Sequence, residues 1–300
     1  MSYIEPINQT KLYGLNKHIN ELILLEKNEN LPNKILLSGQ KGLGKSTLAY
    51  HFINYALSKE GEHKYNIENF EINHESSSFK TIQNKSNPNL LLIDILIEKK
   101  NIDINQIREL ISNLNKSSFN KKPRFVLIDN IEFLNTNSIN ALLKILEEPS
   151  FNVYFILINN NKKILPTLIS RCINFKISLS NQESLDISNR LLDNNLHQLI
   201  NKDLLNYYST PGNIYNLFKF AETNELDIFK KNLKDFLKII IKKNFYKKES
   251  FFKYQIYEFL EFYLNRIAFG VNSKIKNECN YFLKKISNTK RFNLDEELLF

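Results

Sequence analysis

A glycine-rich segment between an apolar run and a helical pattern is the first candidate for chemistry. Residues 39–46 read GQKGLGKS and match the pattern G-x-x-x-x-G-K-[ST]. Gly39, Gly42 and Gly44 permit a tight turn that points several backbone N–H groups inward, where they can surround a phosphate. The start of the following helix adds its partial positive charge at the same place. The segment therefore predicts a nucleotide-binding loop.

Two side chains of this loop have definable roles. Lys45 is expected to reach the β- and γ-phosphates, and the Ser46 hydroxyl to contact Mg²⁺. The predicted ligand is ATP or ADP with Mg²⁺, and the alternative is a loop kept only as a scaffold. The predicted nucleotide-binding residues of the segment are Gly39, Gly42, Leu43, Gly44, Lys45, Ser46 and Thr47.

A second candidate lies further along the chain, in the segment VLIDNIE at residues 126–132. Its apolar run leads into Asp129, whose carboxylate can hold Mg²⁺ at the carboxyl end of a buried strand. Many ATPases of this kind have a glutamate at the next position, but here it is Asn130, and an amide cannot take a proton from water. Losing a general base typically costs about 10²–10⁴ in rate. Glu132 is an alternative carboxylate on the same face, provided that the strand continues.

Alternating strand-like and helical patterns must position these residues. Four short apolar runs predict buried parallel strands: KILLSG (34–39), NLLLIDIL (89–96), RFVLID (124–129) and VYFILIN (153–159). Helical spacing lies between them, for example in DINQIRELISNL (103–114) and SINALLKIL (138–146). The alternation predicts a three-layer α/β domain with a parallel sheet, ending near residue 178.

The remaining chain has helical patterns and no further strand-like runs. Residues 179–225 predict short helices with a break at TPGN (210–213), and residues 226–300 predict longer helices. One helix has an apolar face formed by Phe252, Ile256, Phe259, Leu260, Tyr263 and Ile267. Such a face predicts burial in a bundle or against another subunit. An aromatic platform for single-stranded nucleic acid is the alternative.

Composition limits the class of protein. The chain has 300 residues, 42% of them hydrophobic and 24% charged, which suits two or three globular domains. Cys172 and Cys279 form no CxxC pair, so neither zinc nor a disulfide framework is expected. No run approaches the ~18 apolar residues of a membrane span, so we expect a cytoplasmic protein without membrane contact. The net charge of +9 leaves acidic partners, including nucleic acid, open.

Three segments, in this order, resemble bacterial clamp-loader subunits of the AAA+ family. They are LPNKILLSGQKGLGKSTLAYHFINYAL, NALLKILEEPS and ILPTLISRC, and they most resemble delta-prime subunits of the DNA polymerase III clamp loader. The resemblance covers roughly residues 6–180, whereas the C-terminal third agrees only in length and helical character. LLKILEEPS followed by SRC is more specific than the phosphate loop, which many ATPases share.

The resemblance implies an architecture and a set of partners. It implies a RecA-like P-loop domain (1–178), a helical lid (179–225) and a helical collar domain (226–300) in a five-subunit ring. The implied partners are the gamma/tau and delta subunits of DNA polymerase III, the sliding clamp, and primed DNA reached through the assembled complex. The complex would open the clamp and place it on the DNA.

The resemblance also implies roles for individual residues. Arg171 of SRC matches an arginine finger that points into the ATP site of a neighbouring subunit. A guanidinium suits this role because it is always charged and binds phosphate oxygens in a fork. Asn159 matches a polar sensor residue. Leu12, Tyr13 and Gly14 match the segment that contacts adenine.

Two departures from the hydrolysing relatives bear on activity. Asn130 replaces their glutamate, and Asn213 replaces the arginine of their lid motif. Many relatives also have a four-cysteine zinc module, but residues 58–88 contain no cysteine. The leading hypothesis is a subunit that supplies Arg171 in trans and does not hydrolyse ATP. The alternatives are an active gamma/tau-like ATPase subunit and another DNA-dependent AAA+ ATPase with its own duplex contacts.

Overall fold

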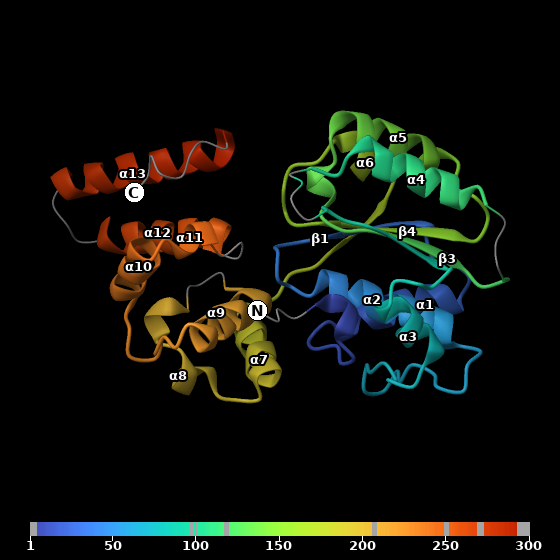
Figure 1. Cartoon of the computed structure of the whole chain (residues 1–300), viewed down its shortest axis with the longest axis horizontal. Helices are drawn as coiled ribbons and strands as arrows, with labels where there is room; N and C mark the ends of the chain where they lie inside the picture. Colours follow the sequence, from blue (N-terminus) through green and yellow to red (C-terminus); the bar gives the residue numbers. More distant parts are fainter. Residues whose placement is uncertain are drawn as a thin grey trace. The chain divides into compact units, whose positions relative to one another are not determined.

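The computed structural model describes residues 5–96, 99, 101–116, 120–205, 209–248, 252–268 and 273–292. These residues belong to two compact units (Figure 1). The first unit comprises Ser2–Ile187 and Thr210–Gly212, and the second comprises Ser188–Ser209 and Asn213–Phe300. The predicted domain boundaries at residues 178 and 225 stay predictions.

The first unit contains a five-stranded parallel sheet in the order β2-β3-β4-β1-β5. Its strands are β1 (Lys34–Ser38), β2 (Leu90–Ile93), β3 (Arg124–Ile128), β4 (Val153–Asn159) and β5 (Ile173–Lys176). The four predicted strands are confirmed, although β2 is shorter than its apolar run. The edge strand β5 was not among the predicted runs, because its sequence INFK alternates apolar with polar residues and forms no continuous apolar run.

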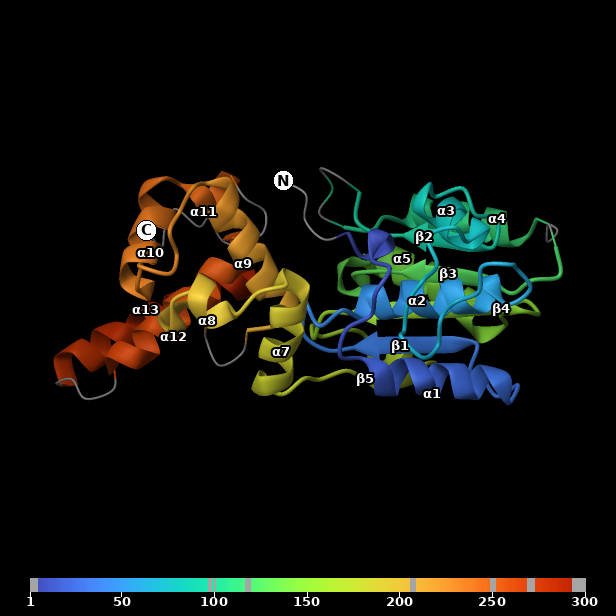
Figure 2. The same ribbon diagram turned by 90° about the horizontal axis from the view of Figure 1, so that it is seen from below.

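Helices cover both faces of the sheet, which confirms the predicted α/β fold (Figure 1). One face is covered by α1 (Asn16–Lys27), α2 (Lys45–Ser58) and α3 (Ser77–Gln83). The other is covered by α4 (Ile104–Leu114), α5 (Thr136–Glu147) and α6 (Pro166–Ile169). Successive strand residues serve opposite cores, as the strand period requires: Ile35 and Leu37 pack with α1–α3, and Leu36 packs with α4–α6. Figure 2 shows α1 and α2 side by side on their face.

Local sequence determines where the helices on the second face begin. Asp103 and Gln106 form a capping box at the start of α4, in which each side chain accepts from the other residue's backbone N–H. The Asn135 side chain accepts from the Ser138 N–H at 2.8 Å and caps α5. Two single-turn 3₁₀ helices in this unit, η1 (Pro6–Asn8) and η2 (Ile131–Phe133), precede α1 and follow β3.

The second unit is helical throughout its described residues, apart from connecting turns. It contains α8 (Leu196–Leu199), η3 (Lys202–Leu204), most of α9 (Pro211–Thr223), α10 (Leu233–Lys242), α11 (Phe245–Lys248), α12 (Phe252–Ala268) and α13 (Ser273–Phe292), while α7 (Asn181–Leu192) joins the units. In α12 the residues Ile256 and Phe259 are buried, and the Phe259 ring packs edge-on against Phe236 of α10 at 5.7 Å between centroids. This favours the packing interpretation over a stacking platform. The side chain of Phe252 lies outside the described residues.

Within the described part of the chain, none of the helices combines the length and the apolar character needed to cross a membrane.

Candidate nucleotide-binding site

The parallel sheet brings the predicted site residues to its carboxyl edge. The glycine-rich loop joins the end of β1 to the start of α2. Ser38 pairs with Asn159 of β4, and Ile128, which precedes Asp129, pairs with Leu157. The loop, the carboxylate and the asparagine therefore converge at one edge, where parallel sheets place their ligands.

The loop needs its glycines for conformation and for space. Gly39, Gly42 and Gly44 have φ values of 155°, 86° and 85°. A Cβ on Gly39 would lie 2.3 Å from the carbonyl oxygen of Ile177, so no side chain fits there. Among the described residues, no acceptor contacts the backbone N–H groups of residues 42–46. These donors form the kind of concave cradle that suits an anion.

Lys45 is almost fully buried within the loop that it belongs to, at 3% exposure. Its Nζ donates to the carbonyl oxygens of Gly39 at 2.9 Å and Gln40 at 2.6 Å. Burial lowers the pKa of Lys45 to about 8, and the charges of Asp129 and Glu132 oppose this shift. The Lys45 ammonium therefore lies beside the backbone N–H groups of the loop and close to the carboxylates of Asp129 and Glu132.

Ser46 and Asp129, the predicted magnesium ligands, meet at this edge. The Ser46 hydroxyl donates to Asp129 Oδ2 at 2.5 Å. Burial raises the pKa of Asp129 to about 6, a shift that the nearby Asp94 reinforces and the Ser46 hydrogen bond opposes. A half-buried carboxylate beside a hydroxyl offers the oxygen ligands that Mg²⁺ prefers, so the magnesium site stays a prediction that these residues suit.

Asn130 takes part in a polar chain across three strand ends. It has left-handed backbone, with φ 55° and ψ 44°. Its Nδ2 donates to Asp94 Oδ1 at 2.8 Å, and its Oδ1 accepts from Asn160 Nδ2 at 2.8 Å. Both ends of the amide are therefore engaged within the protein. Asp94 was not predicted as a site residue, although it ends the run LLLID much as Asp129 ends VLID.

The strand does not continue to Glu132, so the condition on which Glu132 would share the face of Asn130 is not met. β3 ends at Ile128, and Ile131–Phe133 form the 3₁₀ helix η2. Glu132 therefore does not alternate with Asn130 along a strand. Its Oε2 instead accepts from the backbone N–H of Asn160 at 3.2 Å.

Asn159 lies against the loop, with its side chain engaged in a turn. Its backbone oxygen accepts from the Gly39 N–H at 3.3 Å. Its Nδ2 donates to the carbonyl oxygen of Lys162 at 2.9 Å, and its Oδ1 accepts from the Lys162 N–H at 3.3 Å. Asn159 is thus placed beside the cradle with a defined orientation.

The N-terminal segment also adjoins the loop. Leu12 is buried, and its N–H donates to the carbonyl oxygen of Phe70 at 3.1 Å. Gly14 has φ 75°, and a Cβ there would lie 2.1 Å from Ile187 Cδ1. A Cβ on Gly44 would lie 3.5 Å from Leu15 Cδ1, which places the segment that includes Tyr13 next to the cradle.

Residues 210–212 contact the glycine-rich loop, and the sequence did not predict this contact. The Thr210 hydroxyl donates to the carbonyl oxygen of Lys41 at 3.0 Å, and the Gly212 N–H donates to that of Gly42 at 2.9 Å. A Cβ on Gly212 would lie 2.8 Å from Gly42 Cα. The TPG tripeptide indicated only a helix break, because nothing in its pattern signals a partner 169 residues away.

Arg171 lies at the opposite edge of the sheet. It precedes β5, whose first residue Ile173 pairs with Ile35 near the start of β1. Its guanidinium donates to Glu147 Oε1 at 2.6 Å and to the carbonyl oxygen of Thr167 at 2.9 Å, and its side chain remains 33% exposed. The first unit therefore brings together the loop, Asp129, Asn159 and the Tyr13 segment, but not Arg171.

Comparison with known proteins agrees with this geometry. A profile of the family described as "DNA polymerase III, delta subunit" matches residues 14–181. A DNA polymerase III subunit gamma of Buchnera aphidicola (subsp. Schizaphis graminum) is 32% identical over 50% of this chain and 39% of its own length. A DNA polymerase III subunit delta' of the same organism is 26% identical over 91% of this chain and 84% of its own.

Other relatives extend this comparison. The delta' subunit of Buchnera aphidicola (subsp. Baizongia pistaciae) is 32% identical over 47% of this chain and 42% of its own length. The chain thus spans less than half of several of the relatives it matches. A solved DNA polymerase III gamma subunit-related protein from Thermotoga maritima is similar at 17% identity and a TM-score of 0.49, over 93% of this chain and 95% of its own.

Proposed function

The chain belongs to the family described as DNA polymerase III, delta subunit, and from this premise we propose that it is a delta-prime-like subunit of the clamp-loader complex. In that complex it would associate with gamma/tau and delta subunits. The assembly would load the sliding clamp onto primed DNA during replication.

The proposed contribution of this subunit is Arg171, acting as an arginine finger in trans. The position of Arg171 supports this role most directly. Lys176 of β5 pairs with Ser38, the residue before the loop, while Arg171 lies beyond the other end of the same strand. At ~3.3 Å per strand residue, the finger is more than ~10 Å from its own loop along the strand axis. The Arg171 guanidinium is therefore proposed to reach the nucleotide site of a neighbouring subunit, and not the nucleotide site of its own chain.

The surroundings of Arg171 also suit a subunit interface. Leu165, Ile169 and Ile173 are 41%, 41% and 57% exposed, and all lie within six residues of the arginine in the chain. Exposed apolar side chains around a charged anchor are typical of protein interfaces. We propose that this surface faces the neighbouring subunit, and that the α-helical regions 179–225 and 226–300 act as lid and collar.

The site at the carboxyl edge is proposed to bind ATP or ADP with Mg²⁺ without hydrolysing it. The residues fit such a ligand. Among the described residues, no acceptor contacts the backbone N–H groups of residues 42–46, so these groups are available to phosphate oxygens. The side-chain oxygens of Ser46 and Asp129, which would bind the metal, are adjacent. Lys45 would exchange its two carbonyl acceptors for phosphate oxygens. The bound nucleotide would supply phosphoryl oxygens for the lysine and the metal.

The hydrogen bonds of Asn130 support the absence of hydrolysis. An amide that donates to Asp94 and accepts from Asn160 has its orientation set, and its oxygen already has a donor. Even a free amide oxygen could not hold the proton of an attacking water. The alternative, an active gamma/tau-like ATPase, is favoured by the relatives named gamma and opposed by Asn130.

Two measurements test the proposal. Purified chain mixed with a bacterial gamma/tau subunit and a delta subunit should elute from size exclusion as one complex, and absence of any association would contradict the proposal. The isolated chain should bind a fluorescent ATP analogue yet show no turnover above that of its Lys45→Ala variant. Appreciable turnover, abolished by Lys45→Ala, would instead assign the chain to the active ATPases.

A further inference from the structure

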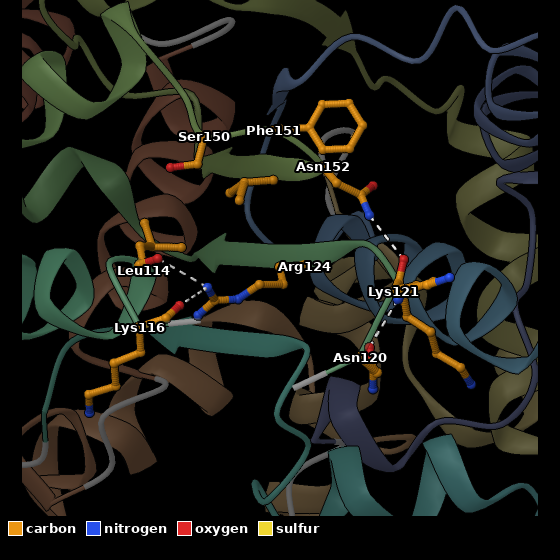
Figure 3. A pocket seen from close by; sticks show the side chains of 10 residues that line it. Leu114, Lys116, Asn120, Lys121, Arg124, Ser150, Phe151 and Asn152 are labelled. Carbon is orange, nitrogen blue, oxygen red and sulfur yellow. Dashed lines mark hydrogen bonds between the residues drawn. The ribbon is translucent and has the colours of Figure 1, made fainter. Parts of the chain in front are cut away.

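The amino edge of the sheet contains a hollow that the nucleotide site does not use. The cavity has a volume of about 490 Å³ and is lined in part by Lys116, Lys121, Lys122, Arg124 and Phe151. Arg124 pairs with Val153, so the hollow lies where β3 and β4 begin (Figure 3). This is the edge opposite the glycine-rich loop. The volume falls within the range of small-ligand pockets.

The lining of this hollow is basic. Four of its ten lining residues are lysine or arginine, and none of the ten is acidic. The Arg124 guanidinium donates to three backbone carbonyl groups at the end of α4, at 2.8–3.2 Å, and Lys122 Nζ donates to the carbonyl oxygen of Leu57 at 3.1 Å. Among the described residues, the partners of both side chains are backbone carbonyl groups, and no carboxylate pairs with either of them. The hollow therefore favours anions.

Phe151 is the second unusual feature of this surface. Its side chain is 99% exposed, in the turn between α5 and β4, and Figure 3 shows its ring extending away from the neighbouring side chains. The aliphatic residues of the lining, Leu114 and Val153, are only 7% and 3% exposed. The ring is therefore the one aromatic side chain among the ten residues that line the hollow.

We propose that this hollow binds a segment of single-stranded nucleic acid. A base would stack on Phe151, and the adjoining phosphates would contact Lys116 and Lys121, which come from the two sides of the hollow. Exposed aromatics combined with cations are how proteins bind single strands without regard to sequence. The lysines would also attract an acidic protein segment, and the polyglutamate probe described below distinguishes that partner from a nucleic acid. Paired bases within a duplex would not expose a face to the ring.

This site goes beyond the proposed function, in which DNA is reached only through the assembled complex. The isolated chain therefore suffices to test it, and failure of subunit association would leave the result unaffected. The probe is a fluorescein-labelled oligothymidylate of about 12 nucleotides, a length within the usual range for single-strand sites. Binding is measured by fluorescence anisotropy at several salt concentrations, without added nucleotide.

Two substitutions separate stacking from charge. Phe151→Ala should weaken binding by about tenfold, since a stacked base is lost. Lys121→Gln should reduce the slope of log K against log salt by about 0.7, the value for one phosphate contact on a single strand. The matched controls are Phe229→Ala and Lys17→Gln, an exposed phenylalanine and an exposed lysine outside the hollow. Both controls should bind as the unaltered chain does, and thermal unfolding checks that all variants fold.

Three results would overturn the proposal. The first is the absence of binding by the unaltered chain. The second is equal binding by the Phe151→Ala and Phe229→Ala variants, which, together with a loss in Lys121→Gln, would indicate general anion attraction. The third is binding of labelled polyglutamate with the same dependence on Phe151, which would assign the hollow to an acidic protein segment.

Discussion

The two edges of the five-stranded sheet differ in how far their side chains are exposed. At the carboxyl edge, Lys45 is buried and Asp129 and Asn130 are half-buried, and their side chains bond to groups of the same site. At the amino edge, Arg171 bonds to Glu147 and to the backbone of Thr167, whereas the Phe151 ring is 99% exposed. The difference between the edges therefore lies in Phe151 and in the exposed Lys116 and Lys121, which extend into solvent.

Under the proposed function, the carboxyl edge would bind nucleotide without hydrolysing it. Binding would need the loop glycines, the lysine and the proposed magnesium ligands, all of which lie at this edge. Hydrolysis needs a free carboxylate beside the attacking water, and Asn130 replaces it with an amide bonded at both ends. The proposed roles of Arg171 and Phe151 at the amino edge both require another molecule, a neighbouring subunit for Arg171 and a nucleic acid strand for Phe151.

The largest expected effect is at Arg171. Arg171→Ala should lower the DNA-dependent ATPase rate of the reconstituted complex at least about tenfold, because fingers of this kind contribute 10³–10⁵ elsewhere. Arg171→Lys should not restore the rate, since an ammonium lacks the fork geometry. Exposed Arg108 of α4 provides the control, and Arg108→Ala should keep full activity. Equal rates for the two alanine variants would remove Arg171 from the proposed mechanism.

The pH dependence of folding stability tests the environment of Asp129 at the carboxyl edge. Its folded pKa of about 6 lies above its ordinary value of 3.8, so the folded state binds the proton more tightly. The contribution of Asp129 to stability is therefore fully present below pH ~4 and is lost as pH rises to ~6, by about 3 kcal/mol at 1.36 kcal/mol per pKa unit.

Replacing the Asp129 carboxylate should remove this pH dependence. Asp129→Asn should be more stable than the unaltered chain by about 1–3 kcal/mol at pH 8 and equally stable near pH 4, as measured by urea unfolding. Exposed Asp186→Asn is the control. A stability difference independent of pH would show that Asp129 is not the titrating group. Magnesium with nucleotide should stabilise only the unaltered chain.

A substitution at Gly212 tests how closely residues 210–212 pack against the glycine-rich loop. Gly212→Ala should destabilise the chain by about 1–3 kcal/mol, the usual cost of overpacking, because its Cβ would lie 2.8 Å from backbone of the loop. Gly61→Ala is a matched control, since its Cβ would meet its nearest atom at an ordinary 3.5 Å. Similar unfolding midpoints for both variants would contradict the tight contact.

The smallest expected effect concerns the pairing of Asn130 with Asp94. Asn130→Glu should destabilise the chain by about 1–2 kcal/mol, because it places a longer residue in left-handed backbone and a second carboxylate beside Asp94. Adding Asp94→Asn should recover part of this loss, as measured by a double-mutant cycle in urea. Additive effects would show that the two side chains do not interact.

The strands that could be predicted are those whose sequence is a continuous apolar run. β4 matches its apolar run VYFILIN residue for residue, and β1 matches its run to within one residue. β5 could not be predicted in the same way, because in INFK the apolar Ile173 and Phe175 alternate with Asn174 and Lys176. β2 is also an edge strand, yet its sequence LLLI is apolar throughout, so a position at the edge does not by itself hide a strand.

In the candidate site, too, some contacts could be predicted from the sequence and others could not. The meeting of Ser46 with Asp129 could be predicted because a motif joins residues of known roles in adjacent elements. The bonds of Asn130 to Asp94 and Asn160 could not, since they depend on where three strands end relative to one another. The Thr210 contact depends on the chain returning from the second unit, which no local pattern records.

The Thr210–Gly212 contact has a consequence for the point at which the chain passes from one unit to the other. Gly212 belongs to the first unit and is bonded to the loop carbonyl of Gly42, while Asn213, its covalent neighbour, belongs to the second unit. Along the chain, one hydrogen bond and one peptide bond therefore link the glycine-rich loop to the residue at which the second unit resumes. A displacement of the Gly42 carbonyl would break or move the bond that fixes the backbone directly before Asn213.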